Sequence, residues 1–335
     1  MKILINCRLP FALAHGGQQI QIERTQAALQ SLGLQVELLR WWDEKKTADL
    51  IHYFGRMPAE QINLAHQKGI KVVMAELLTA PGSRSHSQLR RQKIIKRIMK
   101  HIAPRHFIAS FSWESYQLAD ACVAFTSWEA HLMRYLFGAP AENVRVVPNG
   151  VEDVFFQSPV AQRGKWLVCT ATIAVRKRVL ELAEAAIHSR TPVWIIGRAY
   201  ADSDSYAQKF CTLARQHPQI IRYEGAIQDR AQLAQIYREA RGFVLLSNME
   251  TQSLSAEEAA ACECPLLLSD LPWAHATFGD TARYCPVTKS AVRTAESLRT
   301  FYDAAPSLPA PPKPPSWAEI GRQLKTIYEQ MLGAS

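Results

Sequence analysis

The sequence predicts an α/β protein made of two doubly wound, Rossmann-like domains with a ligand cleft between them. The chain has 335 residues, which is more than one hydrophobic core usually serves. Short apolar strands alternate with helical segments over most of this length, a pattern typical of parallel sheets covered on both faces. The turn-forming run Pro-Asn-Gly at 148–150 interrupts the alternation. We therefore expect one domain on each side of this turn, with ligands between them.

The N-terminal set of elements defines a predicted domain of residues 1–155. A helix is expected from Gln18 to Leu32, and Gly33 ends it by taking the left-handed conformation that glycine tolerates. The predicted strands of this domain are Lys2–Cys7, Leu34–Leu39, Asp49–Phe54, Ile70–Ala75, Asp120–Phe125 and Val144–Val147.

The second set of elements defines a predicted domain of residues 156–310. Helices are expected at Arg178–Ser189 and Ser205–Gln216. The proline-rich segment Ala305–Pro315 is expected to be a non-helical spacer. Residues 316–333 follow as one amphipathic helix, with Ser316 and Glu319 as its capping box. The predicted strands are Trp166–Ala171, Val193–Gly197, Ile220–Gly225, Gly242–Ser247, Pro265–Ser269 and Ala282–Cys285.

The composition is that of a soluble globular protein, with 48% hydrophobic and 21% charged residues. No apolar run is long enough to span a bilayer, and the start lacks a signal-peptide pattern. The seven cysteines are scattered and odd in number, which favours reduced thiols and a cytoplasmic location. Cys262 and Cys264 have no second pair nearby in the sequence, so a zinc site is not expected.

The net charge of +9 is concentrated in one segment, because no acidic residue lies between Glu76 and Glu114. Residues 84–106 combine many cations with several isoleucines. One interpretation is a helix lying on an anionic membrane surface, which would make the protein peripheral at the inner face of a membrane. The alternative is a solvated helix that packs its isoleucines on the domain core. No known nucleic-acid-binding motif accompanies the cations, so a nucleic-acid partner is not expected.

Two glutamates mark a candidate ligand site in the second half. Glu250 follows a buried strand, and Glu258 lies in the small-residue helix that comes next, with seven residues between them. Ligands bind beyond the carboxyl ends of parallel strands, so both carboxylates are placed to line one cleft. In the first half, Gly16 and Gly17 form a turn at a helix N-terminus, which suits a phosphate or an acceptor.

The order strand, Glu250, seven residues, Glu258, alanine-rich helix, Pro265, strand resembles the donor-sugar signature of glycosyltransferase family 4. Blocks that resemble the same family occur in the same order at 119–129, 143–152, 194–197, 223–225, 233–240 and 270–273. The resemblance implies the GT-B fold and retaining transfer from a nucleotide sugar. It also implies that domain 1–155 binds the acceptor, that domain 156–310 binds the donor, and that the C-terminal helix crosses back to the first domain.

In this family the second glutamate of the pair binds the nucleotide ribose, which gives Glu258 that role. The alternative is a capping box that begins at Ser255. The first glutamate touches the donor sugar, a role that falls to Glu250; the alternative is a solvated loop carboxylate. The family loop usually has glycines after this glutamate, whereas this chain has Thr-Gln-Ser-Leu. The backbone amides of Ser253 and Leu254 are then expected to meet the diphosphate at the helix N-terminus.

Lys177 aligns with the lysine of the family's diphosphate clamp. Thr172 stands where the family has arginine, and Arg178 stands where it has glycine. Arg176 or Arg178 is expected to replace the missing cation. The alternative is a basic helix start with no ligand, which the helix dipole disfavours. Gly197 belongs to a matching block and is assigned to the donor site.

The residue after strand Ile70–Ala75 is Glu76, where many family members carry histidine. It is a candidate base or hydrogen-bond acceptor for the acceptor hydroxyl, or else a plain surface glutamate. No Asp-x-Asp pair or histidine cluster lies directly at a strand end, so we expect metal-independent transfer without a cofactor. The expected acceptor is a glycan, a lipid-linked sugar or a protein, as in polysaccharide biosynthesis. The rival interpretations are an epimerase-type enzyme and a non-catalytic protein that binds a nucleotide sugar.

Overall fold

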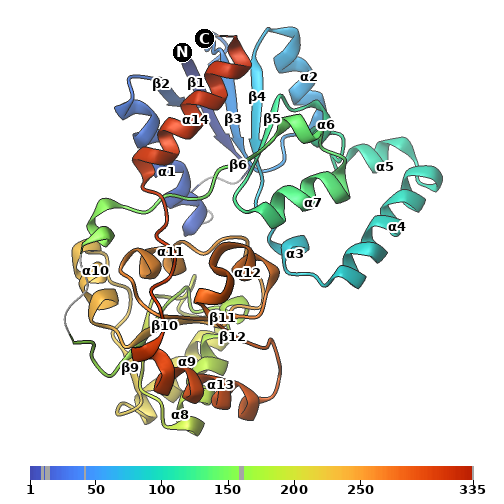
Figure 1. Cartoon of the computed structure of the whole chain (residues 1–335). Coiled ribbons are helices and arrows are strands. Elements are labelled where there is room, and N and C mark those ends of the chain that lie inside the picture. Colours follow the sequence, from blue (N-terminus) through green and yellow to red (C-terminus); the bar gives the residue numbers. More distant parts are fainter. Residues whose placement is uncertain (9–10, 12–15, 41–42, 158–161, 334–335) are drawn as a thin grey trace. The chain divides into compact units, whose positions relative to one another are not determined.

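The computed structural model describes residues 1–8, 11, 16–40, 43–157 and 162–333. The chain forms two compact units, one of Met1–Gly150 with Pro315–Ser335 and the other of Val151–Pro314. We refer to them as unit 1 and unit 2 (Figure 1). The expected domain boundaries are residues 155 and 310, whereas the units divide after Gly150 and Pro314.

Unit 1 contains a parallel six-stranded sheet in the order β2-β1-β3-β4-β5-β6. Strand β3 is buried along its whole length, between β1 and β4. A strand buried on both faces has to be apolar throughout, which explains the run Leu-Ile-His-Tyr-Phe with only one polar residue. The strands are β1 Lys2–Cys7, β2 Gln35–Leu38, β3 Leu50–Phe54, β4 Lys71–Ala75, β5 Ala121–Ala124 and β6 Val144–Val146.

The C-terminal helix α14 (Trp317–Leu332) packs on α1 (Gly17–Ser31) within unit 1. Gly321 allows this approach, since a Cβ there would lie 3.1 Å from the Cβ of Ala28. Ser316 and Glu319 form a capping box at its start, as predicted. The other helices of unit 1 are α2 Ala59–Gln67, α3 Thr79–Gly82, α4 His86–Ile102, α5 Arg105–Ala109, α6 Ser115–Leu118, α7 Ser127–Phe137 and the 3-10 turn η1 Ala141–Asn143.

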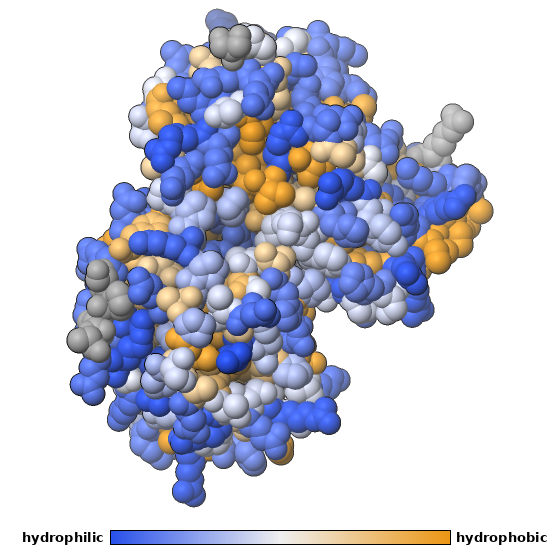
Figure 2. All heavy atoms as spheres, in the orientation of Figure 1, coloured by the Kyte–Doolittle hydropathy of each residue, from blue (hydrophilic) through white to orange (hydrophobic). Residues whose placement is uncertain are grey.

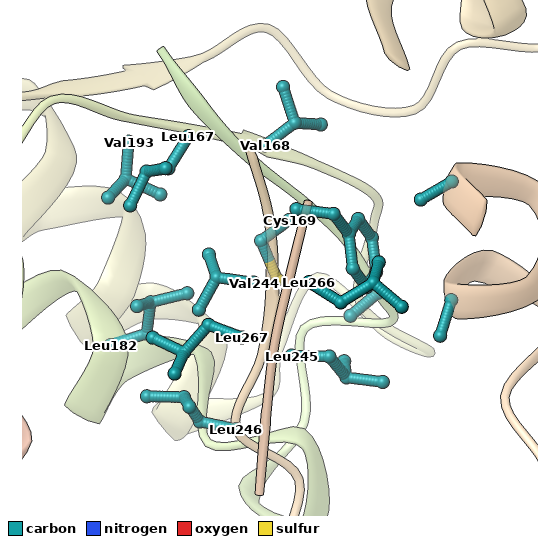
Figure 3. Packing of buried hydrophobic residues seen from close by; sticks show 14 of the residues in the cluster. Leu167, Val168, Cys169, Leu182, Val193, Val244, Leu245, Leu246, Leu266 and Leu267 are labelled. Carbon is teal, nitrogen blue, oxygen red and sulfur yellow. The ribbon is translucent and has the colours of Figure 1, made fainter. Parts of the chain in front are cut away.

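Unit 2 repeats the architecture with a second parallel six-stranded sheet, in the order β12-β11-β10-β7-β8-β9. The central strands supply much of its hydrophobic core, in which Val168, Val244 and Leu267 are almost completely buried (Figure 3). The strands are β7 Leu167–Thr170, β8 Val193–Ile196, β9 Ile221–Tyr223, β10 Gly242–Leu245, β11 Leu266–Ser269 and β12 Arg283–Cys285.

Helices and short 3-10 turns connect the strands of unit 2. The helices are α8 Val179–Ser189, α9 Ser205–Gln216, α10 Arg230–Glu239, α11 Leu254–Ala261, α12 Pro272–Phe278 and α13 Ala291–Ala304. The 3-10 turns are η2 Asp153–Phe156, η3 Val175–Lys177, η4 Gly279–Thr281 and η5 Ala305–Ser307. The expectation that Ala305–Pro315 is wholly non-helical is therefore wrong at η5. Its proline lies in the first turn, where a missing N–H costs nothing.

Among the described residues, no helix is both long enough and apolar enough to cross a membrane.

Candidate functional site

The candidate site is built on two loops of unit 2 that leave neighbouring strands. Strands β7 and β10 pair in parallel, with Val168 opposite Phe243, so the loops that follow them start from the same edge of the sheet. The two loops are also joined through the main chain, because the amide of Asn248 donates to the carbonyl of Arg176 at 3.0 Å. The first loop carries Lys177, and the second carries Glu250.

These loops bring Glu250, Arg176 and Lys177 together, and we call the three side chains the Glu250 cluster. Oε1 of Glu250 accepts from Arg176 Nη1 at 3.0 Å and from the ammonium of Lys177. Arg176 Nη1 also donates to the carbonyl of Met249 at 3.0 Å. Glu250 is only 7% exposed, so the alternative of a solvated loop carboxylate is wrong. Two cations share one carboxylate, which leaves the cluster with a net positive charge suited to an anion.

Arg178 does not join the cluster. Its Nη2 donates to the carbonyl of Thr288 at 2.6 Å, on the loop that precedes α13. Its backbone is left-handed, with φ of 53°, a conformation that glycine adopts without steric cost. Arg178 therefore has the backbone conformation that a glycine would adopt at this position. Of the two arginines expected to replace the missing cation, Arg176 lies beside Lys177, and Thr172 is half-buried in the same loop.

Helix α11 begins at Leu254, and its N-cap is Ser253, whose hydroxyl accepts from the amide of Ala256. The alternative of a capping box starting at Ser255 is therefore wrong, because the helix starts two residues earlier than that box requires. The adjacent Glu257 is buried and accepts from the Gln252 amide group at 2.7 Å. Burial raises the pKa of Glu257 to about 7. The hydrogen bond from Gln252 lowers this pKa, but by less than burial raises it.

Glu258 belongs to a second group of charges, which we call the Arg230 cluster. Arg230, the first residue of α10, donates from Nη2 to Oε1 of Glu258 and from Nε to Oε1 of Glu152 at 2.8 Å. Its guanidinium also lies 4.8 Å from the ring centroid of Phe155. Burial raises the pKa of the Glu258 carboxyl, and Arg230 opposes that rise. Arg230 thus pairs with two carboxyl groups, of which Glu258 is the more deeply buried.

Gly197, at the end of β8, brings two loops of unit 2 into contact. A Cβ at this position would lie 1.9 Å from the carbonyl oxygen of Ala171, so only glycine fits. Its amide donates to the carbonyl of Gly225 at 3.0 Å. A hollow of about 540 Å³ opens beside this crossing, with Arg198, Asp202 and Tyr223 among its lining residues.

In unit 1, Glu76 forms a bidentate ion pair with Arg56. The Arg56 Nε and Nη2 donate to Oε2 and Oε1 at 2.8 and 3.0 Å, and the hydroxyl of Tyr116 also donates to Oε2. The side chain of Glu76 is 19% exposed. The alternative of a plain surface glutamate is therefore wrong. A carboxylate held by three donors is better suited to orienting a hydroxyl than to removing its proton.

Gly16 is the N-cap of α1, with φ of 137°, and Gly17 is the first residue of that helix. No acidic residue occupies the first turn, so the positive end of the helix dipole is not neutralised from within the helix. The role of Gly16 and Gly17 toward the donor stays a prediction.

Sequence reasoning missed Arg230 and Glu152. A signal for Arg230 was present, because a cation at the first position of a helix opposes the helix dipole unless an anion lies nearby. The same conflict pointed to Lys177. Glu152 gave no comparable signal, since its partner lies 78 positions away in the chain.

An Asp-x-Asp pair does occur between β8 and α9, at Asp202 and Asp204. Asp204 is the N-cap of α9, where its carboxylate accepts from the amides of Tyr206 and Ala207. Within the described ranges, no group of three or more histidine, cysteine, aspartate or glutamate side chains is placed to hold a metal ion.

Comparison with known structures shows what the fold is. Sucrose-phosphate synthase from Thermosynechococcus elongatus is similar over 100% of both chains, with a TM-score of 0.71 and 17% sequence identity. Anabaena Alr3699/HepE in complex with UDP matches 99% of this chain and 96% of its own, with a TM-score of 0.63 and 14% identity. The pneumococcal O-GlcNAc transferase GtfA in complex with UDP and GlcNAc matches 95% of this chain and 61% of its own, with a TM-score of 0.60 and 15% identity.

These likenesses, together with the two six-stranded parallel sheets, establish the two-domain α/β fold called GT-B. No protein-family model matches the sequence, and no curated protein matches it either. At sequence identities below 20%, these similar structures are evidence for the fold alone.

Proposed function

We propose that the protein is a retaining glycosyltransferase that moves a sugar from a nucleotide-sugar donor to an acceptor hydroxyl, as glycosyltransferase family 4 enzymes do. In this reaction the bond from the anomeric carbon to the diphosphate breaks, and a bond to the acceptor oxygen forms on the same face. The acceptor hydroxyl gives its proton to the departing phosphate oxygen, on which negative charge grows as the bond to the sugar breaks. The site therefore has to stabilise an anion that grows during the reaction.

The observation that carries the proposal is the Glu250 cluster at the ends of β7 and β10. Lys177 and Arg176 supply the two cations that the leaving diphosphate needs, from a fixed position set by Glu250. Helix α11 begins directly after the loop that carries Glu250, and the backbone amides of Ser253 and Leu254 at its N-terminus are assigned to the diphosphate. Glu250, buried beside these cations, is assigned to the hydroxyls of the donor sugar.

Glu258 is assigned to the ribose of the donor. Its Oε1 is engaged by Arg230, and among the described residues Oε2 has no hydrogen-bond partner. One oxygen is thus held in place while the other remains able to accept from a hydroxyl. Arg230 opposes the rise in pKa that burial imposes on the Glu258 carboxyl, and the ionised form of a carboxyl accepts the stronger hydrogen bond from a ribose hydroxyl.

Residues of unit 1 are assigned to the acceptor side. Glu76 accepts a hydrogen bond from the acceptor hydroxyl to which the sugar is transferred. Arg56 and Tyr116 fix the orientation of the Glu76 carboxylate. Gly16 and Gly17 offer a helix N-terminus to the phosphates of the donor or to the acceptor. The acceptor is a glycan, a lipid-linked sugar or a protein. We place the protein in the cytoplasm, where its seven free cysteines stay reduced.

Thermal unfolding with UDP-, GDP- and ADP-sugars tests the proposal, followed by detection of free nucleotide and of the anomeric configuration of the product. One donor class should raise Tm and release nucleotide when an acceptor is added, because a ligand of the folded state stabilises it by mass action. Lys177→Ala should remove most of the Tm shift. The matched control is Lys209→Ala, which removes an exposed lysine of α9 in the same unit.

Three outcomes would contradict the proposal in different ways. A Tm shift without sugar transfer or hydrolysis would indicate a non-catalytic nucleotide-sugar-binding protein. Interconversion of the donor sugar would indicate an epimerase-type enzyme. An equal donor response in wild type and Lys177→Ala would place the donor away from the Glu250 cluster.

A further inference from the structure

Helix α4 turns an apolar face to solvent. Of its 17 residues only Leu89 and Lys96 are buried. Four isoleucines are at least half exposed: Ile94 at 58%, Ile95 at 54%, Ile98 at 50% and Ile102 at 77%. In Figure 2 hydrophobic atoms gather on this outer side of the helix, at the right of the view. The alternative that the isoleucines pack on the domain core is therefore wrong.

The exposed residues of α4 are sorted into two adjacent arcs. At about 100° per residue, the four isoleucines occupy an arc of about 100°. The neighbouring arc, also about 100° wide, carries Arg90, Lys93, Arg97, Lys100 and His101. Arg91 lies within the isoleucine arc, where its long aliphatic stem can follow an apolar surface while the guanidinium stays in water.

Contacts on the opposite side of α4 fix the direction in which the isoleucines face. The ammonium of Lys96 donates to the carbonyl of Leu136 in α7 and lies 4.5 Å from the ring centroid of Phe137 and 5.0 Å from that of Trp113. Leu89 joins the hydrophobic core that α7 contributes to. Rotation that buries the isoleucines would expel both of these residues from their present partners.

Two further exposed apolar residues follow the helix in the chain. Phe107 of α5 is 46% exposed, and Phe111, which follows it, is 36% exposed. No acidic residue occurs from Leu77 to Trp113, so nothing in this segment neutralises its cations. We call the isoleucine arc of α4, with the adjacent arc of cations, the α4 face.

We propose that the α4 face binds a membrane surface rich in anionic lipid. The isoleucines enter the boundary between headgroups and acyl chains, and the adjacent cations contact the lipid phosphates. A second copy of the chain fits less well, because a symmetric contact between two α4 faces brings the uncompensated cations of both copies together. The inference does not depend on the proposed reaction, since lipid binding is measured without any sugar.

Sedimentation of the full-length protein with vesicles tests the inference. Wild type is expected to pellet with vesicles of 40% phosphatidylglycerol in phosphatidylcholine, and to bind pure phosphatidylcholine far less. Binding should weaken steeply from about 50 to 500 mM salt, as the Debye length shrinks from more than 10 Å to a few ångströms. Arg90→Gln/Arg97→Gln/Lys100→Gln should weaken binding on the order of 100-fold at low salt, because each cation near the surface contributes about fivefold.

Two matched variants control for loss of charge and of surface hydrophobicity. Lys68→Gln/Lys209→Gln/Arg322→Gln removes three exposed cations elsewhere and should bind almost as wild type does. Ile95→Ser/Ile98→Ser should lose binding even where the charges are intact, whereas Leu64→Ser/Val292→Ser removes two apolar residues of similar exposure elsewhere and should not. Circular dichroism and Tm show that each variant folds.

The inference is overturned if wild type fails to bind anionic vesicles at 50 mM salt, or if the α4 variants bind as tightly as their controls. Equal binding to anionic and neutral vesicles would show that the cations of α4 do not contribute to membrane binding, and it would contradict the inferred preference for anionic lipid. Concentration-dependent dimerisation that Ile95→Ser/Ile98→Ser abolishes, without vesicle binding by wild type, would assign the α4 face to a second copy instead.

Discussion

Arg230 and Glu258 come from separate helices of unit 2, and the guanidinium of one donates directly to a carboxylate oxygen of the other. Glu258 is only 5% exposed, and Arg230 opposes the rise in pKa that this burial imposes on its carboxyl. Burial works against the charge on Arg230, yet Glu258 and Glu152 outweigh it and raise the pKa of the guanidinium. The candidate ribose-binding residue is therefore one member of a preformed charge network.

Arg230→Ala is expected to lower the free energy of unfolding by about 3 kcal/mol, because it removes the cation that pairs with the buried carboxylate of Glu258. Urea unfolding at pH 7 measures the change. Arg299→Ala is the control; it breaks a half-exposed pair with Asp303 on the surface of α13 and should cost less than about 1 kcal/mol. Equal losses in the two variants would mean that the Arg230 cluster contributes no more than a surface pair.

The buried carboxyl of Glu257 should make stability fall as pH rises. Its folded pKa of about 7 lies above the usual value of 4.5, so the folded state binds a proton that the unfolded state has released between these two pH values. The resulting loss in the free energy of unfolding is absent below pH 4.5, grows between pH 4.5 and pH 7, and is complete above pH 7, where it is on the order of 3 kcal/mol. Glu257→Gln cannot lose a proton, so its stability relative to wild type should increase from pH 4.5 to pH 7.5. A difference that is constant across this range would contradict the assignment.

Gly197→Ala is expected to destabilise unit 2, because the new Cβ would overlap the carbonyl oxygen of Ala171. Gly225→Ala is a matched control, since Gly225 also has a positive φ of 87° but has open space where its Cβ would lie. The control should cost about 1 kcal/mol for the backbone conformation alone. Gly197→Ala should cost at least about 2 kcal/mol more than the control by thermal or urea unfolding. Similar costs would show that the β7 loop moves aside easily.

Glu76→Gln should lower turnover about 100-fold while leaving the donor-induced Tm shift unchanged, if Glu76 orients the acceptor hydroxyl. Tyr116→Phe removes one of the three donors to Glu76 and keeps the Arg56 pair, so a smaller loss of turnover is expected. Steady-state kinetics and thermal unfolding with donor measure the two effects separately. A reduced donor response in Glu76→Gln would instead indicate a contact with the donor or a general loss of structure.

Transfer is expected to continue in excess EDTA at a rate within twofold of the untreated enzyme, because Lys177 and Arg176 supply the positive charge that a divalent cation would otherwise provide. Asp202→Asn tests the Asp-x-Asp pair directly and should leave turnover unchanged. Loss of activity in EDTA that manganese restores would contradict the proposal, and a matching loss in Asp202→Asn would locate the metal.

The sequence predicted the parallel strands well because the central ones are short apolar runs that are buried along their whole length. The proximity of Glu250 and Lys177 could also be predicted, since both residues follow strands whose carboxyl ends lie at one sheet edge. The Arg230 cluster could not be predicted, because its members come from three separate segments of unit 2. The outward direction of the α4 isoleucines could not be predicted either. Periodicity identifies an apolar face, but it does not say whether that face or the opposite one, which holds Lys96 and Leu89, meets the core.

The course of the chain between the two units has a consequence for the order in which they are made. Unit 2 is one continuous stretch, Val151–Pro314, inserted before the final helix of unit 1. The ribosome therefore completes unit 2 before it makes α14, and the side of α1 that α14 covers stays open meanwhile. Until then, His52 in the middle of the first sheet lacks Tyr328, whose hydroxyl lies 2.6 Å from its Nδ1 in the finished fold. The unit that starts first is thus the one that finishes last.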